Sequence, residues 1–155
     1  MSSKKSLLLV VDASVIHAAE EKDHPISKSC RETLLDIKKV CHRIVMTPAI
    51  RAEWKEHANK FSWKWWRGMV ARRKEENVKD VRSRFKTADI ACLNDKEKEC
   101  LQEDAHLLEG AFEGDGIIIS LDDKAAKIWD KCHEHIQVPK AIRWISPFQW
   151  CDFPS

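Results

Sequence analysis

Short apolar runs alternate with stretches of helical spacing along this chain. The first run, Leu7–Val11, is continuous and leads directly into Asp12. A continuous apolar run of this length predicts a strand buried on both faces, as in parallel sheets that are covered by helices. Further strands are predicted at residues 43–46, 116–120 and 141–145.

The stretches between these runs carry apolar residues at helical intervals. Cys30, Leu34, Ile37 and Cys41 fall at positions i, i+4, i+7 and i+11, which predicts an amphipathic helix over residues 27–40. Other helices are predicted at residues 14–21, from Pro48 onwards with Thr47 as N-cap, at 61–77, from 94 or 95 to 112, and from 122 or 123 to 133. Residues 78–93 show no clear period and receive no element. The alternation of strands and helices over 155 residues predicts one three-layer α/β domain, residues 1–155, with a mainly parallel sheet.

Cysteine usage and hydropathy restrict the compartment. The six cysteines include no CxxC pair, and several fall inside apolar patterns, so we expect reduced thiols in a cytoplasmic protein. Cys132, His133 and His135 have no second cluster of matching spacing, which disfavours a zinc site. The first apolar run is too short for a signal peptide and ends at Asp12, and no apolar stretch is long enough to cross a membrane. We therefore expect no membrane association.

Basic residues are concentrated in one segment. Between Lys60 and Lys86 lie ten basic and three acidic residues, so this segment carries a net charge of +7 and the rest of the chain −5. Its aromatic rings are interleaved with the cations, as in surfaces that hold nucleic-acid backbones and stack bases. Phe61, Trp65 and Met69 follow helical spacing, however, which favours packing for most of the rings. We expect a basic, tryptophan-rich helical segment at about residues 60–93, with RNA contacts from Lys64, Arg67, Arg72, Arg73, Arg82 and Arg84.

Two of the predicted strands are followed by carboxylates. Asp12 directly follows the first strand, and Asp122 follows the strand at 116–120 after one intervening residue. The carboxyl ends of parallel strands share one edge of the sheet, and in open α/β sheets ligands bind at that edge. Helix capping or a turn is the structural alternative for Asp12, as capping is for Asp122 and Asp123.

Two further carboxylates lie on the apolar sides of predicted helices. Asp104 lies four residues from both Cys100 and Leu108, where a lone ionised carboxylate would cost on the order of several kcal/mol. Glu53 follows Ile50 by three residues, although a solvent-facing position is its alternative. We therefore expect four carboxylates, from distant parts of the chain, to converge at one end of the sheet.

Such a convergence has a chemical consequence. Four acids in one site repel each other, and without a cation their pKa values would rise until some took up protons. A divalent cation removes this conflict, and oxygen ligands with room for water suit Mg²⁺ or Mn²⁺. A site of this kind can activate water for in-line attack on a phosphodiester. The basic segment would then hold the nucleic acid.

Four short motifs carry a resemblance to a known family. They are VVDAS at residues 10–14, PAIRAEW at 48–54, EDAHLLEGA at 103–111 and GIIISLDD at 116–123. In order, spacing and element type they resemble the PIN domains, and among them the small VapC-type toxins of bacterial and archaeal toxin-antitoxin pairs. The resemblance implies a parallel, Rossmann-like sheet and a metal-dependent endoribonuclease. It assigns metal ligation to Asp12, Glu53, Asp104 and Asp122, with Ser14 and Ser120 as supporting hydroxyls.

The chain departs from the family pattern in two places. The family often has a second acid two residues after the fourth position, whereas here the second acid, Asp123, is adjacent to Asp122. The choice of ligand between them is open, and we favour Asp122. The tryptophan-rich segment from Phe61 to Leu93 does not align with the family. RNA, a cognate antitoxin protein and a second copy of the chain are its three candidate partners.

Two other functional classes remain. The first is a non-catalytic RNA-binding module that uses the basic residues 60–86, in which case Asp12→Asn and Asp104→Asn would leave function unchanged. The second is a phosphoacceptor regulator of the receiver type. That class usually has an acidic pair after the first strand and a Lys at the end of a late strand, and VVDAS and AIRWIS contain neither. We rank it last.

Overall fold

Five parallel strands form the centre of the computed structural model, which describes residues 6–81, 86–87 and 90–150. The order across the sheet is β3-β2-β1-β4-β5, and all four pairings are parallel. The strands are β1 (Leu8–Val11), β2 (Arg43–Met46), β3 (Glu75–Asn77), β4 (Ile117–Ile119) and β5 (Arg143–Ile145). β1 is therefore the central strand, and the predicted parallel α/β sheet is confirmed.

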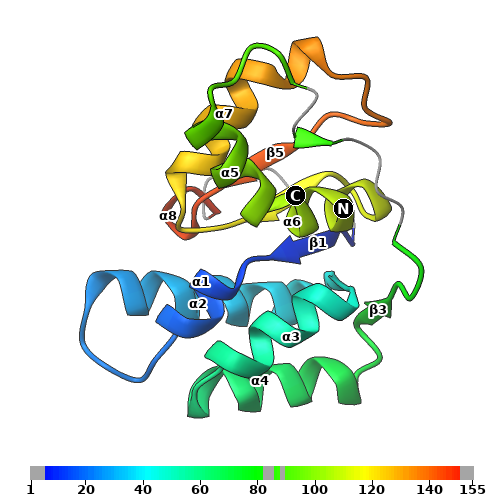
Figure 1. The fold of residues 1–155 in the computed structure, drawn as a ribbon. Helices are drawn as coiled ribbons and strands as arrows, with labels where there is room; N and C mark the ends of the chain where they lie inside the picture. Colours follow the sequence, from blue (N-terminus) through cyan, green and yellow to red (C-terminus); the bar gives the residue numbers. More distant parts are fainter. Residues whose placement is uncertain (1–5, 82–85, 88–89, 151–155) are drawn as a thin grey trace, which may run out of the picture.

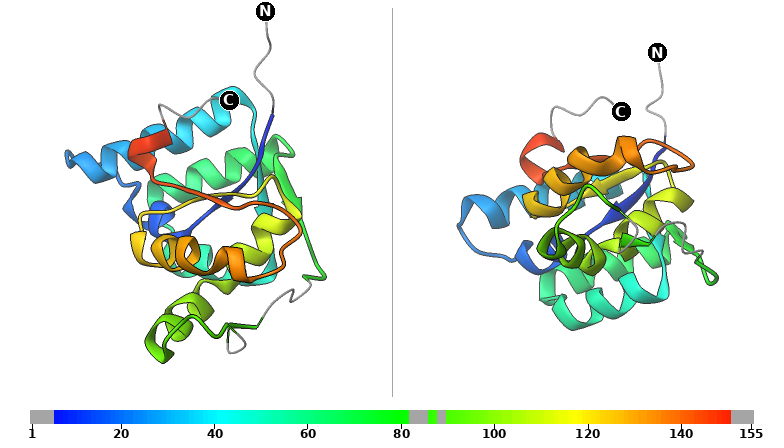
Figure 2. Two further views of the ribbon diagram at one scale, coloured as in Figure 1. Left: turned by 90° about the horizontal axis from the view of Figure 1, so that it is seen from above. Right: turned by 45° about the horizontal axis from the view of Figure 1, so that its top comes forward.

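Helices cover both faces of this sheet. They are α1 (Ala13–Ala18), α2 (Pro25–Val40), α3 (Pro48–His57), α4 (Lys60–Ala71), α5 (Asp95–Glu103), α6 (Ala105–Glu113), α7 (Asp123–Cys132) and the short α8 (Pro147–Trp150), with a 3-10 turn at His133–His135. In Figure 1, α1 to α4 lie below β1, and α5 and α7 lie above it; seen from above in Figure 2, α2 and α7 lie on opposite sides of the strands. The architecture is a three-layer α/β/α sandwich.

The central strand is buried as its sequence predicts. Leu9, Val10 and Val11 are all fully buried, because helices cover both faces of β1. Val10 and Val11 pair with Ile118 and Ile119 of β4, so the carboxyl ends of the two strands lie side by side. The next residues along each strand, Asp12 and Ser120, are thereby brought to the same edge.

Several local signals mark the ends of elements correctly. Thr47 is the N-cap of α3, where its hydroxyl accepts a hydrogen bond of 3.2 Å from the amide of Ile50, and Pro48 is the first helical residue. Asn94 caps α5 and forms a reciprocal capping box with Glu97. Both helix starts agree with the sequence prediction.

The helix predicted over residues 61–77 is shorter in the structure. The helix α4 ends at Ala71, not near Asn77. Arg73 adopts a positive φ of 57°, which is incompatible with a right-handed α-helix. Residues 75–77 instead form β3, which pairs with β2 at the edge of the sheet. The residues Glu75, Glu76 and Asn77 have no apolar pattern, because an edge strand of three residues buries little of its surface.

The structure also bears on compartment and membrane association. Cys30, Cys41, Cys92, Cys100 and Cys132 are free thiols, while Cys151 lies outside the described residues. In the described ranges, every helix is too short or too polar to span a bilayer.

Candidate active site

Asp12 lies at the point where β1 becomes α1. Its backbone amide donates to the carbonyl of Ile119 at 2.9 Å, which joins the ends of β1 and β4. Although Asp12 occupies the N-cap position of α1, its side chain caps nothing. Oδ2 instead accepts hydrogen bonds from the hydroxyls of Ser14, at 2.8 Å, and Ser120, at 2.7 Å. The capping alternative for Asp12 is therefore not observed, and both serines hold its carboxylate in one orientation.

Ser120 connects Asp12 to the start of α7. It is 5% exposed, and its hydroxyl accepts a hydrogen bond of 3.0 Å from the amide of Asp122 while it donates to Asp12. Asp122 is the N-cap of α7, with Oδ1 accepting from the amide of Lys124 at 2.9 Å. Asp123 is the first residue of the helix and is exposed. Both aspartates border a hollow of about 160 Å³ beside this edge of the sheet.

Asp104 interrupts what was predicted as one helix from residue 94 or 95 to 112. It is the C-cap of α5 and the residue before α6, with φ −103° and ψ 8°. A single continuous helix was therefore a wrong prediction. The break lets α6 pack against the central strands while α5 packs against α7. Asp104 is half-buried at the junction, and its side chain caps neither helix.

The surroundings of Asp104 raise its pKa from 3.8 to about 7. Burial is the largest cause, because desolvation disfavours the charged carboxylate. The negative charges of Asp12 and Asp122 raise the pKa further, with smaller contributions from Glu103 and Glu53. Four acids from other elements or turns thus act on one carboxylate, and no basic residue of the described ranges is among the causes of its pKa shift. This site gathers negative charge that only a cation or a proton can balance.

Glu53 reaches the site from α3, which is anchored to the central strand. Its neighbour Trp54 is fully buried and donates from Nε1 to the carbonyl of Val11 at 2.9 Å. The Glu53 carboxylate is 45% exposed and lies 3.7 Å from Nε2 of His57, one turn further along the helix. Glu53 is therefore partly accessible to solvent, and its charge is the last of the four acidic contributions that raise the pKa of Asp104.

The four predicted ligands do not meet at a single point. Among the described residues, three metal-ligating atoms come within 4.8 Å of one another only in the group of Glu53, Glu56 and His57 on α3. The i, i+3, i+4 spacing of this group is visible in the sequence, although only Glu53 of the three was predicted as a ligand. Asp12, Asp104 and Asp122 are electrostatically coupled, yet their oxygens stand further apart than such a group requires.

The predicted RNA contacts differ in where they lie. Lys64 and Arg67 are exposed on α4, and Arg72 and Arg73 are exposed in the turn that follows it. Arg82 and Arg84 lie outside the described residues. Trp65 and Trp66 are buried, whereas Trp63 is 36% exposed, so most of the rings pack and one faces outward, as the helical spacing predicts.

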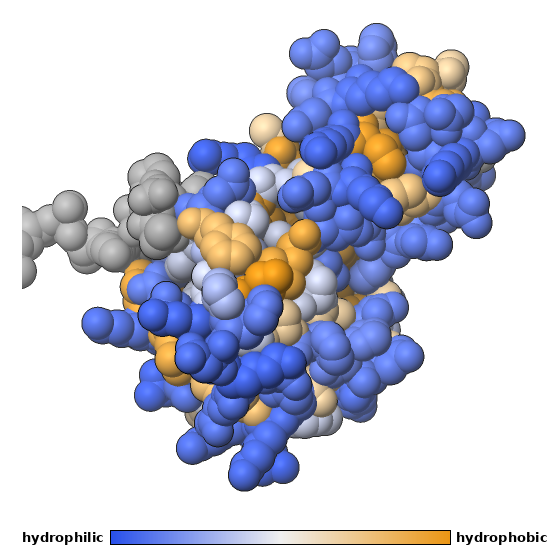
Figure 3. Space-filling model, turned by 90° about the vertical axis from the view of Figure 1, so that its left-hand side faces the viewer, coloured by the Kyte–Doolittle hydropathy of each residue, from blue (hydrophilic) through white to orange (hydrophobic). Residues whose placement is uncertain are grey.

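Figure 3 shows the side of the molecule toward which the carboxyl end of β1 points. Hydrophilic side chains dominate this side, around a smaller group of apolar ones.

The chain matches no known protein-family model, and a search among curated proteins finds no significant match.

The hydroxyl of Ser120 provides a first test of the site. Because it orients Asp12 and also binds the amide of Asp122, we expect Ser120→Ala to lower the RNA cleavage that the family resemblance implies about tenfold, as loss of a residue that orients a ligand typically does. RNA cleavage under saturating Mg²⁺ measures the effect. Ser29→Ala, on α2, is the matched control and should leave activity unchanged. Full activity of Ser120→Ala would contradict a positioning role for this hydroxyl.

Proposed function

We propose that this protein is a metal-dependent ribonuclease of the PIN type, which hydrolyses RNA phosphodiester bonds with Mg²⁺ or Mn²⁺. The observation that carries the proposal is the half-buried Asp104, whose pKa is raised to about 7 by burial and by the acids around it. An uncompensated group of carboxylates is costly to keep unless a cation is bound. All the predicted ligands offer hard oxygen donors, which fit Mg²⁺ or Mn²⁺.

The residues of this chain have distinct roles in the proposal. Asp12 would be the central ligand, since two hydroxyls fix its orientation before any ion binds. Asp104, Asp122 and Glu53 would complete the ligand set. We prefer Asp122 to Asp123, because the charge of Asp122 acts on Asp104 whereas Asp123 is exposed. The bound ion would activate a water molecule for in-line attack and stabilise the leaving oxygen.

RNA is the proposed substrate because exposed basic residues lie on one helix of the domain. Lys64 and Arg67 on α4 provide positive charge for a phosphate backbone. The same observation favours a second candidate, a non-catalytic RNA-binding module. A cytoplasmic location is the proposal that the free thiols support. The toxin role, with a cognate antitoxin or a homodimer, follows from the resemblance alone.

Metal dependence separates the two candidates. We expect the purified protein to cleave single-stranded RNA with Mg²⁺ or Mn²⁺ and to lose this activity in EDTA, while RNA binding persists in EDTA. Gel analysis of labelled RNA measures cleavage, and fluorescence anisotropy measures binding. Cleavage that continues undiminished in EDTA would refute the metal mechanism. Binding without cleavage in either metal would favour the RNA-binding module.

A further inference from the structure

We propose that Trp63, together with Lys60, Lys64 and Arg67 on α4, forms a base-stacking platform for single-stranded RNA. This inference rests on the proposed function and adds the form of the substrate and the residue that grips its bases. Trp63 is one of the few large apolar side chains of the described residues that are exposed, at 36%. Its surroundings are cationic, which sets it apart from an ordinary apolar surface contact.

The neighbours of Trp63 hold its ring in one orientation. It stacks on Trp66, with ring centroids 5.0 Å apart and ring planes 18° apart. Trp66 is itself fixed, because it is 4% exposed and its Nε1 donates to Oε2 of Glu75 at 2.6 Å. Trp54 packs edge-on against Trp66 with centroids 5.1 Å apart. One face of Trp63 is thus covered, and the opposite face is left available to another flat ring.

Cations border the platform on both sides. Lys60, Trp63, Lys64 and Arg67 line a hollow of about 590 Å³ along one face of α4. Trp63 and Arg67 also border a second hollow of about 320 Å³, which extends toward α3. The second hollow is completed by Arg51, Lys55, Trp66, Val70 and Ala71.

The charge of this surface indicates what covers it. The sequence of α4 contains no acidic residue, and no carboxylate of the described part of the chain forms an ion pair with Lys60, Lys64 or Arg67. Arg51, in the second hollow, is paired with Glu75, whereas Lys60, Lys64 and Arg67 leave uncompensated positive charge beside the ring. Such a surface complements a chain that alternates phosphates with planar bases. Duplex nucleic acid would not expose the base faces that this arrangement requires. Single-stranded RNA is therefore the occupant that the geometry favours.

The helix that carries the platform, α4, also lies next to α1, which follows Asp12. Asn59, the N-cap of α4, donates from its side-chain amide to the carbonyls of Ile16, at 3.3 Å, and His17, at 3.0 Å, near the end of α1. α3, which carries Glu53, ends at His57 and leads into the same N-cap. The start of α4 thus lies beside the ends of α1 and α3.

Binding without cleavage tests this inference separately from nuclease activity. The measurement uses the full chain with Asp12→Asn in EDTA and a labelled single-stranded RNA of about 12 nucleotides, followed by fluorescence anisotropy. We expect Trp63→Leu, which keeps an apolar side chain but removes the flat ring, to weaken binding about tenfold. Trp63→Phe keeps a flat ring and should bind within about threefold of the parent.

Two further measurements separate stacking from charge. Inorganic polyphosphate, which has no bases, should bind the Trp63→Leu variant as well as the parent. Lys64→Ala should weaken the binding of both probes, whereas Lys96→Ala, an exposed lysine on α5, should weaken neither. Thermal melting of each variant shows that it is folded.

Three outcomes would overturn the platform. The first is that Trp63→Leu and the parent bind RNA with equal affinity. The second is that Trp63→Leu weakens the binding of polyphosphate as much as the binding of RNA. The third is a dimer in sedimentation experiments that Trp63→Leu dissociates while RNA affinity is unchanged. The last would identify the surface as an interface between copies of the chain. If binding behaves as expected but the wild-type protein does not cleave RNA in Mg²⁺ or Mn²⁺, the proposed nuclease function fails and the platform stands.

Discussion

We expect Asp12→Asn to lower RNA cleavage by at least about a hundredfold at saturating Mg²⁺, while the protein remains folded. Asparagine has nearly the same shape as aspartate, and the hydroxyls of Ser14 and Ser120 can still bind its amide oxygen. The change therefore removes the negative charge of the central proposed ligand with little change in packing. Single-turnover cleavage of labelled RNA measures the loss, and thermal melting verifies the fold.

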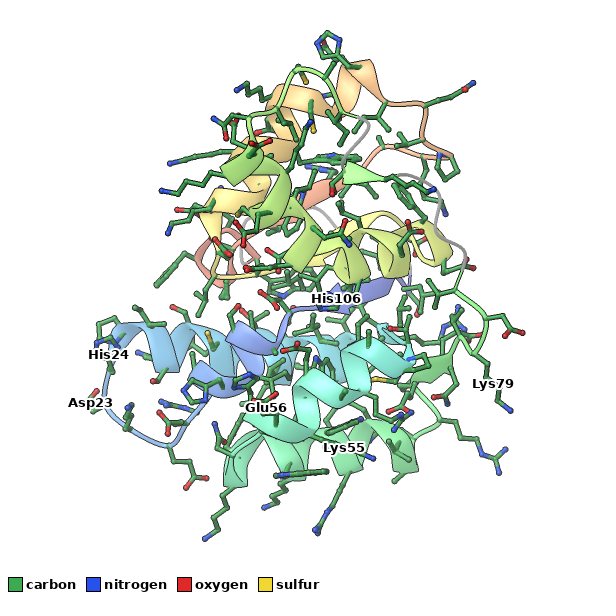
Figure 4. All side chains as sticks on the ribbon, in the orientation of Figure 1. Asp23, His24, Lys55, Glu56, Lys79 and His106 are labelled. Atoms are coloured by element: carbon green, nitrogen blue, oxygen red, sulfur yellow. The ribbon has the colours of Figure 1, made fainter. Side chains whose placement is uncertain are left out.

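The matched control is Asp23→Asn. Asp23 is exposed in the loop between α1 and α2 (Figure 4). Its replacement removes one negative charge from the same domain and should leave cleavage unchanged. Wild-type activity in Asp12→Asn would exclude the acidic site as the seat of catalysis. Equal losses in the two variants would point to a general effect of charge on RNA binding.

We expect the second large effect from Asp104→Asn, which should lower activity and raise stability. Cleavage should fall about a hundredfold because a proposed ligand is lost. Stability without metal should rise at pH 8, on the order of 1–2 kcal/mol, since solvent screening reduces the full cost of this half-buried charge. A gain in stability on removal of a ligand is the behaviour of a group retained for function at a cost to the fold.

The pH dependence of that gain follows from the direction of the pKa shift. The pKa of Asp104 is about 7 in the folded chain and near 3.8 in the unfolded chain. Between these values the folded state holds the extra proton, so wild-type stability falls as pH rises from about 4 to 7. The stability difference between Asp104→Asn and the wild type should therefore be largest at pH 8 and vanish toward pH 4.

Urea denaturation in EDTA at several pH values measures this difference, with Asp23→Asn again as the control. Protons and Mg²⁺ should also compete for Asp104, so the apparent affinity for Mg²⁺ in the wild type should increase as pH rises through about 7. A constant destabilisation by Asp104→Asn at all pH values would mean that the carboxylate is a structural hydrogen-bonding group. The acidic site would then lose its main physical support.

The sequence predicted the elements whose signals are local. A continuous apolar run identified β1, and Thr47 and Asn94 identified helix starts, because capping involves residues three positions apart. Asp104 was predicted within one helix, since the spacing of Cys100, Asp104 and Leu108 continues through the point where the backbone breaks. The break depends on α5 and α6 packing against different elements, which residue spacing does not encode.

The amino-acid sequence by itself determined the parallel α/β class, the carboxylates that end or flank the strands, and the segment that carries the positive charge. These properties follow from composition and short-range periodicity. The tertiary structure decided that Glu75–Asn77 is an edge strand, that Asp104 is surrounded by other acids, and that Trp63 is the exposed ring among buried ones. Each depends on contacts between residues far apart in the chain, which are formed only when the layers pack together.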